Sequence, residues 1–198
     1  MDGLQVWIEA STPFIRTEFK NRDLANSMLA LGRLVHRDVD LVPPSDENKS
    51  CLDPFFEEIE KRFYLFSPVD RSITIYGLGM LAELEKIKPE LVTTCVEAIK
   101  KFGYHDEVST RDLLDQFSGF VRMADCGNNV DPIFIADFEE YLFSRMESFN
   151  ERDMNNFERI RKALDDIEVV TPYRFSPAEA ARRHHERLIG ASRIGDPR

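Results

Sequence analysis

A repeat of about 40 residues is the feature that most limits what this chain can fold into. Four segments align, and each has an apolar first residue followed four positions later by an aspartate. The segments begin at Phe19, Phe66, Val108 and Phe149, and their aspartates are Asp23, Asp70, Asp112 and Asp153. The intervals are 47, 42 and 41 residues, and the first is lengthened by the polar insert LVPPSDENKS. A repeat of this length predicts a stack of similar supersecondary units.

The spacing inside each segment is helical. Leu113, Phe117, Phe120, Val121 and Ala124 fall at i, i+4, i+7, i+8 and i+11, on one face of a helix. Seven residues beyond each aspartate, small or apolar residues recur in register, as ALGRL, GLGML, GFVRM and IRKAL. We therefore expect each segment to form an amphipathic helix.

Helix-capping signals mark where these helices should begin. A hydroxyl or amide residue followed three positions later by a carboxylate can satisfy the free backbone N–H groups of a first turn. Such pairs are Ser67 and Asp70, Ser109 and Asp112, Asn150 and Asp153, and Ser176 and Glu179. The Asn150 pair is a looser version, and Lys20 breaks the pattern in the first segment. We interpret the repeated aspartates as capping residues.

A second helix should follow in the first three segments, at Asp53-Pro54, Lys88-Pro89 and Asp131-Pro132. Proline suits the first turn of a helix, where no internal hydrogen bond is lost. The expected fold is all-α, a short right-handed α-solenoid of stacked helix–turn–helix hairpins. Its units would be residues 19–65, 66–107, 108–148 and 149–173. Residues 1–18 would form an N-terminal cap packed through Val6, Trp7, Ile8 and Phe14.

Composition limits the class of protein further. The 198 residues have a net charge of −10 and are 42% hydrophobic, as expected of one globular domain and not of a disordered chain. The longest apolar stretch is too short for a membrane-spanning helix, so we expect no membrane insertion. The three cysteines lack disulfide or zinc spacing, and the N-terminal residues carry no readable targeting signal.

The sequence contains no constellation that predicts catalysis. Asp125 to Asp131 lacks the glycine and glutamate of a calcium loop and is expected to be an inter-helix loop. Gly77 and Gly79 lie in a helical context, unlike the glycines of a nucleotide loop, and are expected at close helix–helix contacts. Cys95 is expected to be buried. We therefore expect no enzyme activity, no cofactor and no metal site.

A change of charge sets the C-terminal residues apart. Residues 174–198 carry a net charge of +3, which leaves −13 on the rest, and are expected to form a basic helix and tail. Its arginines are candidate partner-binding residues, namely Arg182, Arg183, Arg187 and Arg193.

The Phe19 to Leu34 run, FKNRDLANSMLALGRL, followed by DPFFEEI, resembles the degenerate helical repeats of organellar proteins. These are the heptatricopeptide, octotricopeptide and FAST-kinase-like units, relatives in style of the pentatricopeptide proteins; HEAT-type repeats are the alternative. The resemblance covers about residues 19–165. It implies a mitochondrial or plastid location and, for many members, single-stranded RNA binding.

A body charge of −13 opposes RNA binding, because nucleic-acid affinity depends largely on Lys and Arg. The chain is also similar to short repeat proteins that serve as accessory subunits of protist mitochondrial assemblies, such as the pentatricopeptide-like F1 subunit of the euglenozoan ATP synthase. We therefore expect a non-catalytic docking subunit of a large mitochondrial assembly, with an ATP synthase or respiratory complex favoured. Its partners would be protein subunits. The alternative is an organellar RNA-binding repeat protein or a mitoribosome subunit.

Overall fold

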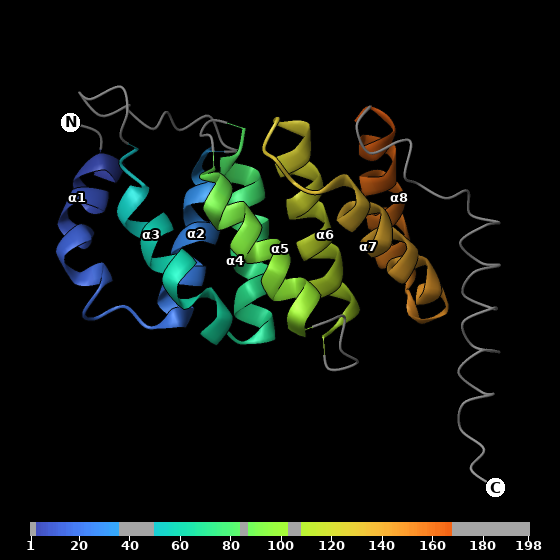
Figure 1. The fold of residues 1–198 in the computed structure, drawn as a ribbon, viewed down its shortest axis with the longest axis horizontal. Coiled ribbons are helices and arrows are strands. Elements are labelled where there is room, and N and C mark those ends of the chain that lie inside the picture. The colour runs from blue at the N-terminus through green and yellow to red at the C-terminus, as the bar shows by residue number, and fades with distance from the viewer. Residues whose placement is uncertain (1–2, 36–49, 84–86, 103–107, 168–198) are drawn as a thin grey trace, which may run out of the picture. The chain divides into compact units, whose positions relative to one another are not determined.

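The computed structural model describes residues 3–35, 50–83, 87–102 and 108–167 (Figure 1). All regular structure within these ranges is helical, and the chain divides into two compact units, Met1–Val130 and Asp131–Arg198. The first unit contains α1 (Gly3–Ile15), α2 (Asn21–Val35), α3 (Asp53–Arg62), η1 (Phe63–Leu65), α4 (Pro68–Leu81), α5 (Pro89–Phe102) and α6 (Thr110–Asp125). The second unit contains α7 (Pro132–Ser144), η2 (Met146–Ser148) and α8 (Glu151–Asp165). The all-α prediction is confirmed for these residues.

Alternate helices of the first unit lie side by side in two rows (Figure 1). One row is α2, α4 and α6, in which each helix packs along the next. The other is α1, α3 and α5, in which α3 contacts both neighbours. The repeated aspartates Asp23, Asp70 and Asp112 all lie in the first turns of the first row. The prolines Pro54 and Pro89 lie in the first turns of the second row, as the sequence predicts.

Glycine allows the helices of the first row to touch through their backbones. A Cβ atom added to Gly77 of α4 would lie 2.6 Å from the carbonyl carbon of Met28 in α2. One added to Gly119 of α6 would lie 2.4 Å from the carbonyl oxygen of Ile75 in α4. No real side chain fits at such distances, because protein interiors are already close-packed. The predicted close helix packing at Gly77 is confirmed, and Gly119 makes a contact of the same kind.

The same contacts are made from the opposite side by Gly32 and Gly79. Their added Cβ atoms would lie 2.7 and 2.6 Å from backbone atoms of the glycine in the next helix. The glycine that faces the preceding helix stands seven residues after the repeated aspartate, and the one that faces the following helix stands nine after it. Other residues fill these positions where no glycine is present. Ala30 of α2 and Ile160 of α8 stand seven residues after their aspartates, and Val121 of α6 stands nine residues after its aspartate.

The core of each unit contains buried aromatic side chains. Buried aromatic residues of the first unit are Phe55, Phe56, Phe63, Phe66, Phe117 and Phe120. In the second unit Phe157 of α8 packs edge-on against Phe143 of α7, with ring centroids 5.2 Å apart. Cys95 of α5 is fully buried, as predicted.

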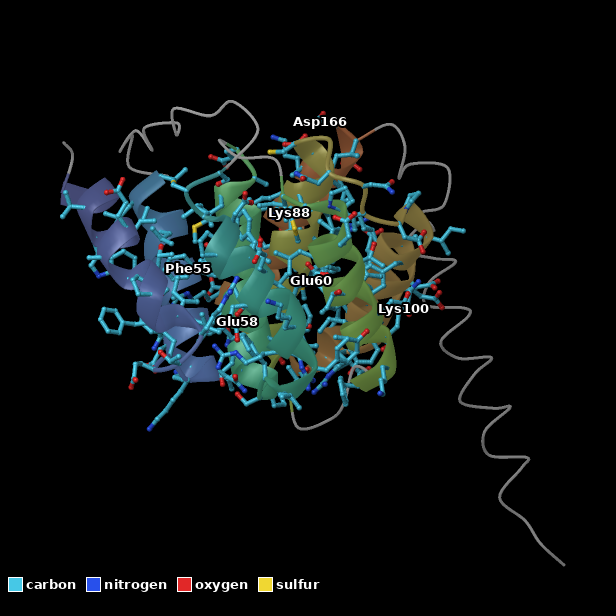
Figure 2. All side chains as sticks on the ribbon, turned by 60° about the vertical axis from the view of Figure 1, so that its left-hand side comes forward. Phe55, Glu58, Glu60, Lys88, Lys100 and Asp166 are labelled. Atoms are coloured by element: carbon cyan, nitrogen blue, oxygen red, sulfur yellow. The ribbon has the colours of Figure 1, made fainter. Side chains whose placement is uncertain are left out.

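Ion pairs line the exposed side of α3. Lys88, just before α5, lies 2.9 Å from Asp53 Oδ1 and 4.0 Å from Glu57 Oε1, near Glu60 (Figure 2). The hydrogen bond to Asp53 is the main cause of the raised pKa of Lys88. These contacts join the start of α3 to the start of α5, so they reinforce the packing of the second row.

The predicted packing of the first helix is wrong for two of its four apolar residues. Ile8 is buried, and Trp7, although 42% exposed, stacks on Phe55 of α3. Val6 and Phe14 are 47% and 53% exposed. The inner face of α1 is formed instead by Ile8, Ser11 and Ile15, at i, i+3 and i+7. A single helix turns only one side toward its neighbours, so the remaining apolar residues face outward.

Candidate docking surface on the first helix

The residues predicted to cap helices lie at helix N-termini. Ser67 and Ser109 are the N-cap residues of α4 and α6, and each hydroxyl accepts a hydrogen bond from the backbone N–H three residues on, at 3.2 Å. Each hydroxyl also donates to the aspartate carboxylate, to Asp70 at 2.7 Å and to Asp112 at 2.6 Å. These carboxylates therefore stabilise local helix starts.

The cap at Asn150 is the more complete one. Its side chain accepts from the Asp153 N–H at 2.9 Å, and the Asp153 carboxylate accepts from the Asn150 N–H at 3.4 Å. This reciprocal pair is the full capping box. At Lys20, where the sequence pattern breaks, the backbone N–H still donates to Asp23 at 2.9 Å. The repeated aspartate thus keeps its role even where the preceding residue cannot cap.

Other predicted site residues lie outside the described part of the chain. The capping pair Ser176 and Glu179 falls there, as do the candidate partner-binding arginines Arg182, Arg183, Arg187 and Arg193. A docking role for these arginines stays a prediction.

The described residues offer no grouping that resembles a metal centre. Among them, no three His, Cys, Asp or Glu side chains gather closely enough to hold a metal ion. The loop from Cys126 to Asp131 connects α6 to α7, with Gly127 at φ +76°, as expected of an inter-helix loop. Within the same residues, no helix is both long enough and apolar enough to cross a bilayer.

The outward side of α1 carries the largest group of exposed apolar side chains on one described helix. Val6, Ala10, Pro13 and Phe14 fall at i, i+4, i+7 and i+8, and all four are exposed. Trp7 borders them and stacks on Phe55 of α3, with ring centroids 5.9 Å apart. We call Val6, Trp7, Ala10, Pro13 and Phe14 the outer α1 face.

This face differs from the solvent side of the other helices in charge. Glu9 is the only charged residue of α1, whose sequence is GLQVWIEASTPFI. A helix that is apolar on both sides is typical of a buried position. The outer α1 face is therefore suited to contact with another apolar surface.

Sequence reasoning missed this face because it assigned the apolar residues of the first helix to a single packed side. The signal was available in the spacing. Ile8, Ser11 and Ile15 form one stripe, and Val6, Ala10 and Phe14 form a second stripe on the opposite side.

Comparisons with known proteins add no relative. No protein-family model, no curated protein and no solved structure matches this chain.

Proposed function

We propose that this protein is a non-catalytic helical-repeat subunit that docks other proteins, folded as a short right-handed α-solenoid. The outer α1 face carries the proposal. It exposes Val6, Trp7 and Phe14 together on the first helix of the first unit. Terminal units of a helical stack normally present a polar outer side, because an apolar one favours association.

The solenoid fold is supported by the alternation of the two helix rows. Hairpin repeats place every first helix beside the next first helix, and every second helix beside the next second helix. The backbone contacts at Gly32, Gly77, Gly79 and Gly119 recur at fixed distances from the repeated aspartates. The same glycine-mediated contact between neighbouring helices therefore occurs more than once along the chain.

The proposed occupant of the outer α1 face is an apolar helix of a partner protein subunit. The face is uncharged apart from its neighbour Glu9, so a charged ligand such as a nucleic acid would gain little there. The small Ala10 lies between the larger Val6 and Phe14, which leaves room for side chains of an opposing helix to interdigitate.

The proposed host is a large mitochondrial assembly, most favourably an ATP synthase or a respiratory complex. The support is the resemblance of Phe19 to Leu34 to organellar helical repeats, together with the net charge of −10. An acidic subunit suits a protein-rich assembly better than a ribosome, whose proteins meet RNA. RNA binding is the competing function.

The test is to tag the protein, separate native complexes by size and identify what migrates with it by mass spectrometry. We expect it to migrate with a large energy-converting complex at constant stoichiometry, and RNase treatment to change nothing. Migration near 23 kDa, or in particles that RNase disperses, would contradict the proposal.

A further inference from the structure

Among the described residues, one buried arginine of the first unit has no carboxylate partner. Arg71, in the first turn of α4, is 8% exposed, and among the described residues no carboxylate lies within ion-pair distance of it. Its guanidinium lies 4.0 Å from the ring centroid of Phe102 and donates to the Tyr64 carbonyl oxygen at 3.3 Å. Its buried Nε has no hydrogen-bond partner.

Other partly buried arginines form ion pairs with carboxylates. Arg62, Arg122 and Arg161 have side-chain exposures of 22%, 23% and 27%, and each lies 2.8 to 3.0 Å from a carboxylate oxygen. Burying a charge without a counter-ion is unfavourable, because the desolvation is not offset by an ion pair. An anionic partner would supply this missing compensation at Arg71.

The position of Arg71 on its helix strengthens this expectation. Side chains of a helix lean toward its N-terminus, so the guanidinium reaches back to the carbonyl of Tyr64 in η1. The N-terminal end of a helix favours anions and disfavours cations. Burial also lowers the pKa of Arg71. An anion bound here would offset both the burial of the charge and its unfavourable position at the helix N-terminus.

A second cation lies near the ring that Arg71 contacts. Lys101 is exposed, and its Nζ lies 5.5 Å from the ring centroid of Tyr64 and 5.4 Å from that of Phe102. Its neighbour Lys100, at the same end of α5 (Figure 2), is 3.8 Å from Glu97. Lys101 therefore adds positive charge near the Phe102 ring, which Arg71 also contacts.

The nearest acidic side chain in the sequence, Asp70, is engaged elsewhere. Its Oδ1 accepts from Arg22 Nη1 of α2 at 2.7 Å, and its Oδ2 accepts from the Ser67 hydroxyl at 2.7 Å. Asp70 thus serves the helix cap and the α2–α4 contact.

Two exposed side chains belong to η1, the segment to which Arg71 donates its hydrogen bond. Leu65 of η1 is 73% exposed, the highest value among the large apolar residues of the described chain. Tyr64 is 38% exposed. We call this group of residues the Arg71 corner: Tyr64, Leu65, Arg71, Lys101 and Phe102.

We propose that the Arg71 corner binds an acidic peptide segment of a partner protein, in which a carboxylate side chain stands next to an aliphatic one. The carboxylate would meet Lys101 at the surface and the exposed remainder of Arg71 beneath it. The aliphatic side chain would cover Leu65, beside Tyr64. A free phosphate could use the two cations but would gain nothing from Leu65, so this exposed apolar residue favours a peptide.

This inference builds on the proposed protein-docking function but names a surface other than the outer α1 face. The probe is a fluorescein-labelled ten-residue peptide of alternating Glu and Leu, followed by fluorescence anisotropy with the full chain. We expect Arg71→Met to weaken binding at least about tenfold, the effect of losing a charge-assisted contact. Lys101→Gln and Leu65→Ser should each weaken it by about threefold or more. The matched control Arg111→Met, which removes an exposed arginine of α6, should bind as the wild type does.

Stability separates binding from a structural role of Arg71. Removing a buried cation that lacks a counter-ion should leave the thermal midpoint of Arg71→Met unchanged or raised. If that variant unfolds, Lys101→Gln and Leu65→Ser decide the question, because both side chains are exposed. Val6→Ser/Phe14→Ser should bind the peptide normally, so failure of the outer α1 face and failure of the Arg71 corner are distinguishable.

Four results would overturn the proposal. The first is equal binding by the wild type and all three corner variants. The second is equal binding of a Gln–Leu peptide, which lacks the carboxylates. The third is displacement of the peptide by inorganic phosphate at the same concentration, which would indicate a simple anion site. The fourth is tighter Arg71-dependent binding of an oligouridine RNA, which would support nucleic-acid recognition.

Discussion

Gly119 of α6 lies against the backbone of Ile75 in α4, so closely that a Cβ atom would come within 2.4 Å of the Ile75 carbonyl oxygen. We expect Gly119→Ala to lower the free energy of unfolding by about 2–4 kcal/mol, because two helix backbones must separate to admit the methyl group. Urea denaturation followed by circular dichroism measures the change.

The control for this substitution is Gly127→Ala. Gly127 has φ +76° and nothing within 4 Å of an added Cβ, so only backbone strain opposes the methyl group there. We expect a loss of about 1 kcal/mol. Equal losses at Gly119 and Gly127 would show that the helix contact in the first row is not as tight as described.

The reciprocal cap at the start of α8 should contribute measurably to stability. Asn150→Ala removes the acceptor for the Asp153 N–H, and we expect a loss of about 1 kcal/mol in the free energy of unfolding. Asn150→Ser, which can still cap, should lose much less. A helix start that tolerates alanine as well as serine would remove the capping role assigned to this repeated pair.

A buried ion pair should stabilise the second unit. Arg161 Nε donates to Glu139 Oε1 at 2.8 Å, and its guanidinium lies 4.6 Å from the ring centroid of Phe143. Because Glu139 is 2% exposed, we expect Arg161→Met to cost about 2–4 kcal/mol by thermal unfolding. Glu139→Gln added to it should restore part of this loss.

The comparison for Arg161 is Arg159→Met, on the exposed side of the same helix. Arg159 donates only to Asn156 at 2.8 Å, so the change should stay within about 0.5 kcal/mol. Similar losses for the two arginines would argue against a stabilising pair with Glu139.

Burial of Cys95 should make stability depend on alkaline pH. Burial raises the pKa of the Cys95 thiol, and the Glu60 carboxylate adds to the shift. The folded state thus keeps its proton to higher pH than the unfolded state, whose thiol titrates near pH 8.5. Cys95 therefore contributes stability below about pH 8.5 that is lost as the pH rises above this value.

Cys95→Ala isolates this effect from other alkaline titrations. We expect the stability of the wild type relative to the variant to fall by up to about 1.4 kcal/mol per pH unit above about pH 9. Unfolding in urea at several pH values measures the difference. Parallel stability curves for the two proteins would show that the thiol is not protected by burial.

Local signals predicted most of the helices. The pairs Ser67 and Asp70, and Ser109 and Asp112, lie at helix starts because capping depends on a few neighbouring residues. Close packing at Gly77 and Gly79 was also predictable, because both lie in a helical context. The division of the chain into two units after Val130 was not predicted, because 198 residues is the length of one domain.

The candidate sites were less predictable because they depend on tertiary packing. The outer α1 face left a signal, the second apolar stripe of a helix with Glu9 as its one charge. The Arg71 corner has no signal in the sequence. Arg71 and Phe102 are far apart in the chain, and neither residue is unusual in its own helix. That no described carboxylate pairs with Arg71 can be seen only in the three-dimensional structure.

The most direct test of the docking function is to compare native size separation of the wild type with that of Val6→Ser/Phe14→Ser. Both side chains are exposed, so the variant should keep the thermal midpoint of the wild type. We expect the wild type to migrate in a large assembly and the variant to migrate near 23 kDa. Undiminished migration of a folded variant with the assembly would contradict docking through the outer α1 face.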